Sequence, residues 1–547
     1  ATRVNASGNI EKETENLFTY SNTFTDSDWT KTSVSITAGQ AGYDGSSDAS
    51  LIEVLTSGAP RKIAHNQTTA TGVLTMSIYA KAGTAPIIAV EAAGSNGFYK
   101  YFNLSTGTGG SQGGSIIDSS MVDVGGGWYR LSITGNPTSV SSPQYFVCDV
   151  DNSTSAAAGS NLYIQDAQLE QGLVARDYIE TTTTAIYGGI TDNVPRLDYT
   201  DSSCPALLLE PQRTNSITGS EYFDGGSLIN TAITAEYNTA DTLSPEGLYN
   251  AAKLTAASNF PRYYDFPTIA DNVNVTLSSF AKAGSASVFT IRAFNKSNQT
   301  AVVNFDLSEG TAELSQYDEL TPSFDIVDMG NDWYRCSITT NTGSGATAFQ
   351  IRPISHAQGE TGGWSGSNYI YAYGAQMEQD ATYPTSYIPT YGSAVTRGVE
   401  QAIKTIGTSY FPSTGFSAFL EVDVTADTIN NFADIYQLGG GSTQFRLETR
   451  VNERIYIQQG NMVTSGYNFN AYSLCPTTAK KLCFTFSPTQ VKAYVDGVLI
   501  DTFDGVYNFS PIDTINFAMQ TSSVACKQTL LFGSVLTQSE AIALTTI

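Results

Sequence analysis

An internal repeat of about 200 residues is the feature of this sequence that most constrains its fold. The segment VLTMSIYAKAG ends at Gly83, and VNVTLSSFAKAG ends at Gly284. Further pairs follow in the same order: GGGWYRLSIT (Gly125–Thr134) with GNDWYRCSIT (Gly330–Thr339), YIQDAQLEQ (Tyr163–Gln171) with YAYGAQMEQ (Tyr371–Gln379), and the tails DYIETT and SYIPTY. Similar openings, NLFTYS at Asn16 and NSITGS at Asn215, precede them. This order, with a slowly growing offset, indicates two copies of one domain that differ by loop insertions.

Apolar residues within each copy recur at every second position. In the first copy these positions include Leu74, Met76, Ile78 and Ala80. Such alternation, bounded by clusters of Gly, Asn, Asp and Ser, is typical of half-buried antiparallel strands, whereas helical periodicity is almost absent. A domain of about 165 to 180 residues made of short strands and Gly-rich turns predicts a β-sandwich of jelly-roll type.

The sequence after about residue 400 has a different strand pattern. Val491–Val495 and Val498–Ile500 alternate around Asp496-Gly497, the residue pair that a type I′ hairpin turn requires. Between the two copies lies Gly188–Asn215, whose apolar run Ala206–Leu209 predicts an ordered connector that docks on its neighbours.

We therefore predict an all-β chain of three sandwiches. The predicted segments are an N-terminal lead-in (1–15), a first jelly-roll sandwich (16–180), a connector (181–214), a second jelly-roll sandwich (215–394), a further connector (395–412) and a third sandwich (413–547).

Charge narrows the class of partner. Lys and Arg number 27 against 51 Asp and Glu, a formal charge of −24, so nucleic acid and anionic membrane surfaces would repel the chain. No stretch approaches the ~18 consecutive apolar residues of a membrane helix, and the first thirty residues lack the order of a secretion signal. We therefore expect neither nucleic-acid binding nor membrane insertion. The chain begins at Ala1 rather than at Met, which leaves open an upstream anchoring segment.

The sequence lacks the common catalytic motifs. It contains no G-x-S-x-G, H-E-x-x-H, phosphate-binding loop or dinucleotide fingerprint, and its two histidines, His65 and His356, lie in separate regions. Nothing marks one pair of its 51 acids for glycoside hydrolysis. The six cysteines form no C-x-x-C pair and predict reduced thiols, of which Cys148 and Cys336 fall on inward-facing strand positions. We predict no enzymatic activity and no cofactor, and we leave a structural calcium ion open as an alternative.

One loop is the candidate for that calcium ion. The run DVDNSTS (Asp149–Ser155) places Asp149 and Asp151 at an oxygen-rich spacing that calcium accepts. It lacks the glycine and the distal glutamate of an EF-hand loop, and Asp and Asn favour turns on their own account. A solvated turn is therefore the favoured interpretation, and calcium binding is the alternative.

Aromatic side chains are the candidate ligand contacts. The clusters FYKYF (Phe98–Phe102), RYYDF (Arg262–Phe266) and YNFNAY (Tyr467–Tyr472) hold more rings than one buried face absorbs, so some must be exposed or lie at a subunit interface. The candidates from these clusters are Tyr99, Tyr263, Tyr264 and Tyr467.

Two settings of tryptophan lead to different predictions. Trp128 recurs as Trp333 in the same frame, which favours a shared packing role over ligand binding. Trp364 lies in GETGGWSGSN (Gly359–Asn368), a loop that is longer than its counterpart in the first copy. An exposed indole among Gly and Ser would stack on a sugar ring. The alternative, favoured by a small margin, is that Trp364 folds back onto its own sandwich or into a neighbouring subunit.

Several of these motifs, taken together, resemble a family of tailed-bacteriophage virion proteins described as head fibres, head spikes or tail fibres. They are ATRVNASGNIE (Ala1–Glu11), VPRLDYTDSSCPALLLEPQRTN (Val194–Asn215), the WYR strand, and the AQLE or AQME and YIPT closing motifs, over residues 1 to about 400. The third region resembles a concanavalin A-like (laminin G-like) sandwich through AYVDGVLI (Ala493–Ile500). Family members often carry Trp where this chain has Gln165 and Tyr373.

The resemblance implies carbohydrate-binding-like modules displayed on a virion, with no shared catalytic residues. We expect a fibre, spike or decoration that is assembled in the host cytoplasm, exposed on the particle exterior and attached to other virion proteins of the capsid or tail. Its ligand would be host-surface polysaccharide, held by weak multivalent contacts. A homo-oligomer, with a trimer favoured by analogy with phage fibres, would supply that multivalency. The alternatives are a polysaccharide depolymerase tailspike and a capsid cement protein without a ligand.

Overall fold

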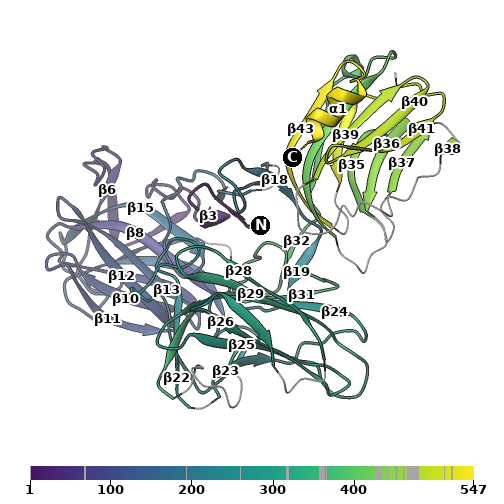
Figure 1. Ribbon diagram of the computed structural model, residues 1–547. Coiled ribbons are helices and arrows are strands. Elements are labelled where there is room, and N and C mark those ends of the chain that lie inside the picture. The colour runs from purple at the N-terminus through teal and green to yellow at the C-terminus, as the bar shows by residue number, and fades with distance from the viewer. Residues whose placement is uncertain are drawn as a thin grey trace.

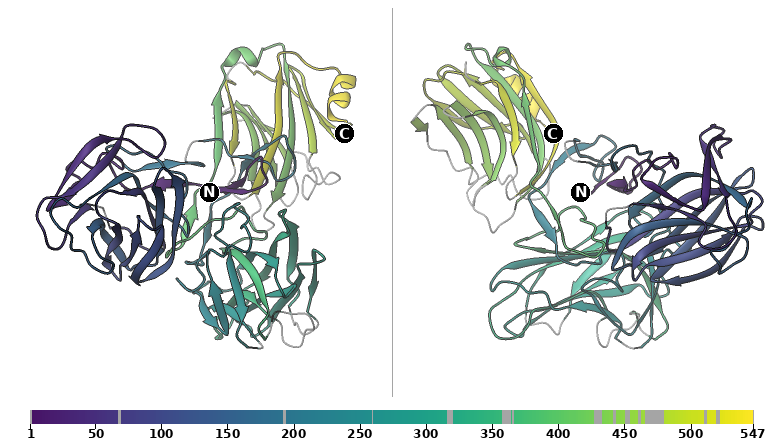
Figure 2. Two further views of the ribbon diagram at one scale, coloured as in Figure 1. Left: turned by 90° about the vertical axis from the view of Figure 1, so that its left-hand side faces the viewer. Right: turned by 180° about the vertical axis from the view of Figure 1, so that it is seen from behind.

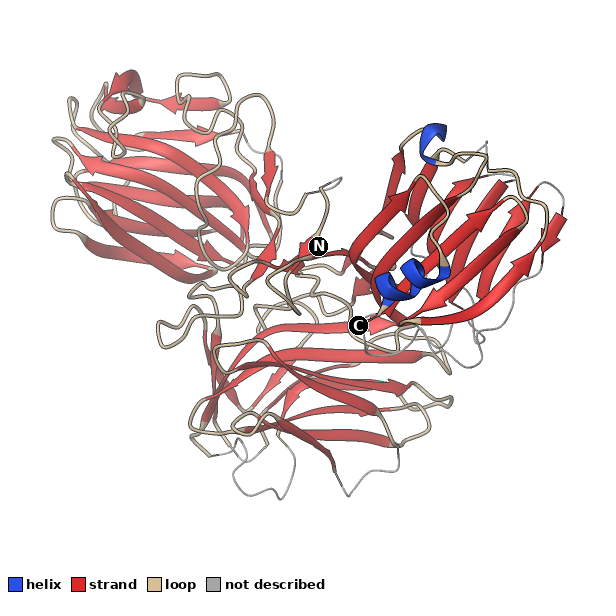
Figure 3. Ribbon diagram, turned by 45° about the horizontal axis from the view of Figure 1, so that its top comes forward, coloured by secondary structure: helices blue, strands red, loops and turns tan. Residues whose placement is uncertain are grey.

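The computed structural model forms three lobes built almost entirely of strands (Figure 1). It describes residues 2–66, 69–191, 194–258, 260–315, 320–356, 364, 366–426, 433–440, 443–449, 454–459, 462–464, 480–509, 512–518 and 522–546. The N-terminus lies where the three lobes meet, as two further views also show (Figure 2). The described helices both lie in the third lobe (Figure 3).

The first lobe is a sandwich of two six-stranded antiparallel sheets. One sheet contains β4 (Trp29–Thr32), β7 (Lys62–His65), β9 (Ile87–Ser95), β10 (Phe98–Asn103), β11 (Thr108–Gly114) and β14 (Ser139–Cys148). The other contains β5 (Val34–Gln40), β6 (Ala49–Val54), β8 (Leu74–Ala82), β12 (Ile116–Gly125), β13 (Trp128–Gly135) and β15 (Asn161–Gln171). Their orders are β11-β10-β9-β14-β7-β4 and β12-β13-β8-β15-β6-β5. Leu74, Met76 and Ile78 are fully buried between the sheets, as the alternation predicts.

The second lobe repeats this topology strand for strand. One sheet contains β20 (Ile229–Thr231), β23 (Arg262–Asp265), β25 (Val288–Phe294), β26 (Thr300–Asp306), β27 (Thr311–Leu314) and β30 (Gln350–Ser355). The other contains β21 (Ile233–Glu236), β22 (Ala252–Ala256), β24 (Asn274–Ala283), β28 (Ser323–Asp328), β29 (Trp333–Asn341) and β31 (Tyr369–Gln379). The orders are β20-β23-β30-β25-β26-β27 and β21-β22-β31-β24-β29-β28. The predicted repeat of two sandwiches is confirmed.

The third lobe is a further sandwich. Its larger sheet contains β34 (Phe416–Ala426), β39 (Lys480–Ser487), β40 (Gln490–Val495), β41 (Val498–Asp504) and β43 (Ser522–Phe532), together with β17 (Leu197–Asp198) and β18 (Ala206–Leu209). Its other sheet contains β33 (Gln401–Thr405), β35 (Ala433–Gly440), β36 (Thr443–Thr449), β37 (Arg454–Gln459), β38 (Met462–Thr464) and β42 (Thr514–Ala518). Asp496 (φ 46°) and Gly497 (φ 81°) form the predicted hairpin turn between β40 and β41.

The connector is part of the third sandwich. β18 pairs with β43, and Leu209 at its end lies in the third core. β33 likewise pairs with β42, although residues 395–412 were expected to be a connector. The third sandwich therefore takes strands from both connectors and extends beyond residues 413–547. The chain leaves the first sandwich, adds β17 and β18 to the third, and only then builds the second.

The repeated opening and closing motifs fasten each jelly-roll sandwich through one hydrogen-bond pattern. The Asn16 side-chain amide donates to the carbonyl oxygens of Ala167 (3.1 Å) and Ile179 (2.8 Å), and Asn16 Oδ1 accepts from the backbone N–H of Leu169 (3.2 Å). The matching bonds of Asn215 run to Ala375, Ile388 and Met377. The motifs that repeat in the sequence thus have a structural role.

Short strands and buried charges join the three lobes. The short strands are β1 (Thr2–Val4) with β2 (Ile10–Lys12), β3 (Thr14–Asn16) with β16 (Ile186–Gly188), and β19 (Arg213–Asn215) with β32 (Val395–Arg397). Glu210 accepts hydrogen bonds from both Arg196 and Arg397, each at 2.7 Å. Burial raises the pKa of Glu210, but the two guanidinium groups outweigh that effect and lower it well below its usual range.

A C-terminal helix, α1 (Gln538–Thr545), was not predicted. Thr537 and Glu540 form a capping box at its start, a short pattern that the sequence does contain. Within the described residues, no helix has the length and apolar character needed to cross a membrane.

Candidate functional site

One sheet of the second sandwich has its outer face covered at the junction of the lobes. Ile10 from the N-terminal lead-in packs against Phe280, Trp333 and Tyr373, which lie on β24, β29 and β31. The outer face of this sheet therefore serves as an interface within the chain. The opposite sheet, which contains β23, β25 and β30, remains as the candidate for external contacts.

The repeated tryptophans are both buried. Trp128 is 3% exposed and Trp333 is 1% exposed. The indole N–H of Trp333 donates to the carbonyl oxygen of Leu243 at 2.8 Å, which satisfies its one polar atom. The packing interpretation is confirmed.

Gln165 and Tyr373, the two departures from the resembled family, are also buried in polar networks. Gln165 Nε2 donates to Asp48 Oδ1 at 2.8 Å. The Tyr373 hydroxyl donates to Glu246 Oε2 at 2.9 Å and accepts from the Lys12 ammonium at 3.1 Å. These two side chains therefore hold loops and the lead-in against the sandwiches, and neither is placed to stack on an external sugar.

Three arginines lie close together on the outer face of the opposite sheet of the second sandwich. Arg292 on β25 is the register partner of Arg352 on β30. Arg262 on β23 pairs with Ser355, which pairs on its other side with Thr290, two residues before Arg292. All three arginines are partly exposed. No ion pair is formed by Arg262 or Arg352 with any acid in the part of the chain that the structure describes.

Aromatic rings support these cations. The Arg352 guanidinium carbon lies 4.5 Å from the ring centre of Phe294, and that of Arg292 lies 5.2 Å from the same ring. The guanidinium carbon of Arg262 lies 5.5 Å from the ring centre of Tyr264. Cation–π contacts of this kind stabilise a guanidinium beside a ring. One N–H of Arg352 also donates to Gln350 Oε1 at 2.9 Å, and one N–H of Arg262 donates to the carbonyl oxygen of Phe260 at 3.2 Å.

Burial and electrostatic repulsion among the arginines lower the pKa of Arg352. Burial, followed by the positive charges of Arg292 and Arg262, lowers the pKa of Arg352 to about 10. Arg352 therefore remains a cation at neutral pH, in a site where an added negative charge is favourable.

The matching face of the first sandwich carries balanced charges. Glu91 on β9 lies between Tyr99 on β10 and Gln144 on β14 in the strand register. The Lys62 ammonium donates to Gln144 Oε1 and lies 5.5 Å from the ring centre of Phe146. Burial raises the pKa of Glu91, although nearby Lys62 opposes the rise. This face thus offers a tyrosine, an amide and one charge of each sign.

The predicted ligand residues separate into two groups. Tyr99 and Tyr264 are partly exposed on the outer faces just described. Tyr263 and Trp364 are 0% exposed and lie in the core of the second sandwich, so neither can contact an external ligand in this structure. For Tyr263 the reason is strand alternation, since its neighbour Tyr264 takes the outward position. Tyr467 lies outside the described residues.

The loop with the calcium candidates uses its carboxylates to fasten neighbouring strands. Asp149 accepts from the Ala157 backbone N–H (2.7 Å) and the Ser160 hydroxyl (2.8 Å). Asp151 accepts from both the backbone and the hydroxyl of Ser111. The described residues contain no cluster of three His, Cys, Asp or Glu side chains suited to a metal ion. These bonds favour the interpretation as a structural turn.

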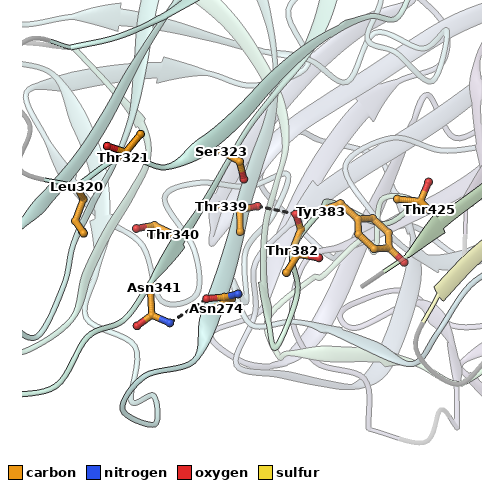
Figure 4. A pocket seen from close by; sticks show the side chains of 10 residues that line it. All are labelled: Asn274, Leu320, Thr321, Ser323, Thr339, Thr340, Asn341, Thr382, Tyr383 and Thr425. Atoms are coloured by element: carbon orange, nitrogen blue, oxygen red, sulfur yellow. Dashed lines mark hydrogen bonds between the residues drawn. The ribbon is translucent and has the colours of Figure 1, made fainter. Parts of the chain in front are cut away.

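A polar cavity of about 510 Å³ lies between the second and third sandwiches (Figure 4). Its lining is neutral and includes Asn274, Asn341 and Thr425. The hydroxyl of Tyr383, which also lines it, accepts from the Ser523 backbone N–H at 3.0 Å and so joins the two lobes. This cavity therefore belongs to the interface between the second and third sandwiches.

The strand register brings together arginines that sequence analysis missed. Arg292 stands between the core residues Ile291 and Ala293. A lone arginine in an apolar strand run is the available signal for an outward position. The sequence does not show which strands are neighbours, so it does not predict that the three arginines meet.

Comparison with known proteins finds only partial likenesses. No family model and no curated protein sequence matches this chain. The binding domain of botulinum neurotoxin DC in complex with rat synaptotagmin II is 16% identical, with a TM-score of 0.24, over 26% of this chain and 39% of that one. The Ruminococcus gnavus IT-sialidase CBM40 is 14% identical, with a TM-score of 0.22, over 27% of this chain and 99% of that one. This chain thus spans about two fifths of the neurotoxin domain. At these scores the likenesses carry no argument about function, and the protein is defined here as an all-β, three-sandwich chain.

Proposed function

We propose that this protein is a non-enzymatic virion component that projects from a phage particle and binds host-surface glycans. The observation that carries the glycan-binding proposal is the equivalence of two outer sheet faces. In both jelly-roll sandwiches the face not used at the junction presents a partly exposed tyrosine, Tyr99 or Tyr264, beside charged or amide side chains. A flat ring surrounded by hydrogen-bonding groups suits a sugar ring.

The virion assignment rests on the sequence motifs that resemble phage fibre and spike proteins. The architecture agrees with a projecting role, because β18 and the Glu210 network link the lobes through buried contacts rather than through a free linker. Immunogold labelling of the chain on intact particles tests this assignment. Label on the exterior of the head or tail supports it, and absence of the chain from purified particles overturns it.

Retention on host-surface polysaccharide tests glycan binding. We expect Tyr99→Ala and Tyr264→Ala each to weaken retention, and the double variant to lose most of it, because avidity sums the two faces. Tyr410→Ala is the matched control, since Tyr410 is 55% exposed in the third lobe, away from both faces. Equal retention of the double variant and the wild-type protein would refute the assignment of the site.

The same assay separates the rival functions. A depolymerase would release new reducing ends from the polysaccharide, a binder would be retained without releasing them, and a capsid cement would do neither. The proposed function requires retention without release.

Oligomerisation through sandwich faces would provide several sites on one particle. We propose a homotrimer, because the chain carries exposed apolar residues but no coiled-coil heptads. Val506 (87% exposed) and Ile403 (60% exposed) are among the apolar side chains that an interface in the third lobe would cover. Light scattering of the full chain should give about three times 58.4 kDa, and a monomer across micromolar concentrations would contradict the proposal.

A further inference from the structure

We propose that the outer face formed by β23, β30 and β25 of the second sandwich binds carboxylate-bearing glycans, such as polyuronates, in preference to neutral ones. This inference rests on the proposed glycan-binding function and adds the chemical class of the ligand. We name this surface, comprising Arg262, Arg292, Arg352, Tyr264 and Phe294, the arginine face.

The register of three neighbouring strands sets the spacing of the cations. Arg292 and Arg352 are direct register partners. Ser355 pairs with Arg262 on one side and with Thr290 on the other. Since neighbouring strands lie ~4.8 Å apart, the three guanidinium groups occupy one patch of the sheet rather than separate sites.

The charge of this patch is opposite to that of the whole molecule. The chain has a formal charge of −24, with 51 acids available to pair with 27 Lys and Arg. Elsewhere in the structure, buried arginines such as Arg196 and Arg397 are paired with Glu210. Arg262 and Arg352, which form no ion pair with an acid among the described residues, are therefore a local exception, and the repulsion that Arg352 experiences from its neighbours is relieved when an anion binds beside it.

The geometry of the side chains favours a carboxylate over a dispersed negative surface. Phe294 makes cation–π contacts with both Arg352 and Arg292. A guanidinium held in this way presents a planar fork of N–H donors that matches the two oxygens of a carboxylate. A polyuronate carries one carboxylate on each sugar ring, so successive rings can engage successive arginines.

Aromatic rings at the edge of the patch provide the contact for the sugar itself. Tyr264 and Phe266 are T-shaped, with ring centres 5.7 Å apart, and Phe266 is 48% exposed. Stacking of a pyranose ring on an exposed aromatic ring would distinguish a glycan from a simple anion.

The first sandwich supplies an internal comparison. Lys62, the register partner of Phe146, occupies the position that Arg262, the partner of Ser355, has in the second sandwich. Glu91, the register partner of Gln144, occupies the position that Arg292, the partner of Arg352, has there. A carboxylate thus stands in the first sandwich where an arginine stands in the second. The same fold therefore offers a charge-balanced face and a cationic face, and only the second is suited to acidic sugars.

Calorimetric titration of the full chain with tetragalacturonic acid tests the inference. We expect Arg352→Gln and Arg262→Gln each to weaken binding about tenfold, the effect of losing one charge-assisted contact. Binding should also weaken as salt is raised. Lys492→Gln, a partly exposed position on β40 of the third sandwich, is the matched control and should leave the affinity unchanged. The melting temperature of each variant reports whether its fold is intact.

Four outcomes would overturn the inference, and they differ in what they leave standing. Equal affinity for tetragalacturonic acid and its methyl ester would refute selectivity for carboxylates but leave glycan binding intact. Unchanged binding by the double variant Arg352→Gln/Arg262→Gln would refute the location. Equal binding of single-stranded DNA would show a general anion site rather than a glycan site. If the wild-type protein binds no acidic glycan but is still retained by neutral host polysaccharide, only the inference is refuted. If it binds neither acidic nor neutral glycan, the proposed function is refuted as well.

Discussion

The ammonium group of Lys12 lies 2.7 Å from Oε1 of Glu221, and the two side chains are only 2% and 0% exposed. Lys12 belongs to the N-terminal lead-in, whereas Glu221 belongs to the second sandwich. Glu246 lies 2.9 Å from the same ammonium group, and the hydroxyl of Tyr391 accepts from it at 2.9 Å. Burial alone would lower the pKa of Lys12, but the two carboxylates outweigh that effect and raise it. The lead-in is therefore held by a charge that stays ionised in the core of the junction.

Removal of this charge should destabilise the protein strongly. Lys12→Met leaves Glu221 buried without the cation that it contacts, which costs about 3–5 kcal/mol in the free energy of unfolding. Lys253→Met is the control, because the Lys253–Asp241 pair is open to solvent and its loss should change the free energy of unfolding far less. Urea denaturation measures both values. A loss below about 1 kcal/mol for Lys12→Met would show that the junction does not depend on this ion pair.

Trp364 should behave as a core residue. Its side chain is 0% exposed and packs in the core of the second sandwich, so Trp364→Ala should cost about 3–5 kcal/mol of stability. Chemical denaturation gives this value, and Tyr264→Ala on the exposed face should cost less. An unchanged melting temperature combined with lost retention on host polysaccharide would instead support the ligand interpretation.

Acidification should stabilise the first sandwich through Asp166. Burial raises the pKa of Asp166 from 3.8 to about 7. The folded protein therefore holds a proton that the unfolded chain releases between about pH 4 and 7, so this contribution to stability is lost as the pH rises through 7. Asp166→Asn should reduce the fall in melting temperature between pH 5 and 8, since a neutral side chain no longer titrates.

The choice of asparagine keeps this test conservative. Asp166 has a φ of 55°, a conformation that asparagine tolerates well. Asp123→Asn, at an exposed position, is the control and should leave the pH profile unchanged. If Asp166→Asn retains the full pH dependence, another group is responsible for it.

Thiol labelling should separate buried from exposed cysteines. Cys148 and Cys336 are 0% exposed. Cys336 lies in the core of the second sandwich as expected, whereas Cys148 packs beside Phe146 on the outer side of its sheet and does not face inward. Burial raises the pKa of Cys148 to about 12 and that of Cys336 far above its usual range, so neither forms the reactive thiolate near neutral pH. A maleimide followed by peptide mapping should label the exposed Cys204 rapidly and the two buried thiols only after unfolding. Labelling of Cys336 as fast as Cys204 in the native protein would contradict the strand register.

Local residue patterns predicted those parts of the protein that depend on neighbours in the chain. Period-two alternation placed Leu74, Met76 and Ile78 in a core, because side chains of a strand point to opposite faces in turn. The dipeptide Asp496-Gly497 predicted its turn, because few residues tolerate positive φ. The repeat itself predicted two copies of one topology, which the strand orders match.

The tertiary structure alone decided which faces are covered and which residues meet. Strand pairing brings Arg262, Arg292 and Arg352 together from positions that are 30 to 90 residues apart in the chain. It also sends β18 into the third sandwich before the second is built. Trp364 was placed in a polar loop by its sequence neighbours, yet the core of its sandwich accepts the indole. Such outcomes depend on which strands pair and on the free energy of burying a surface against distant segments, and neither quantity is encoded in the local pattern around one residue.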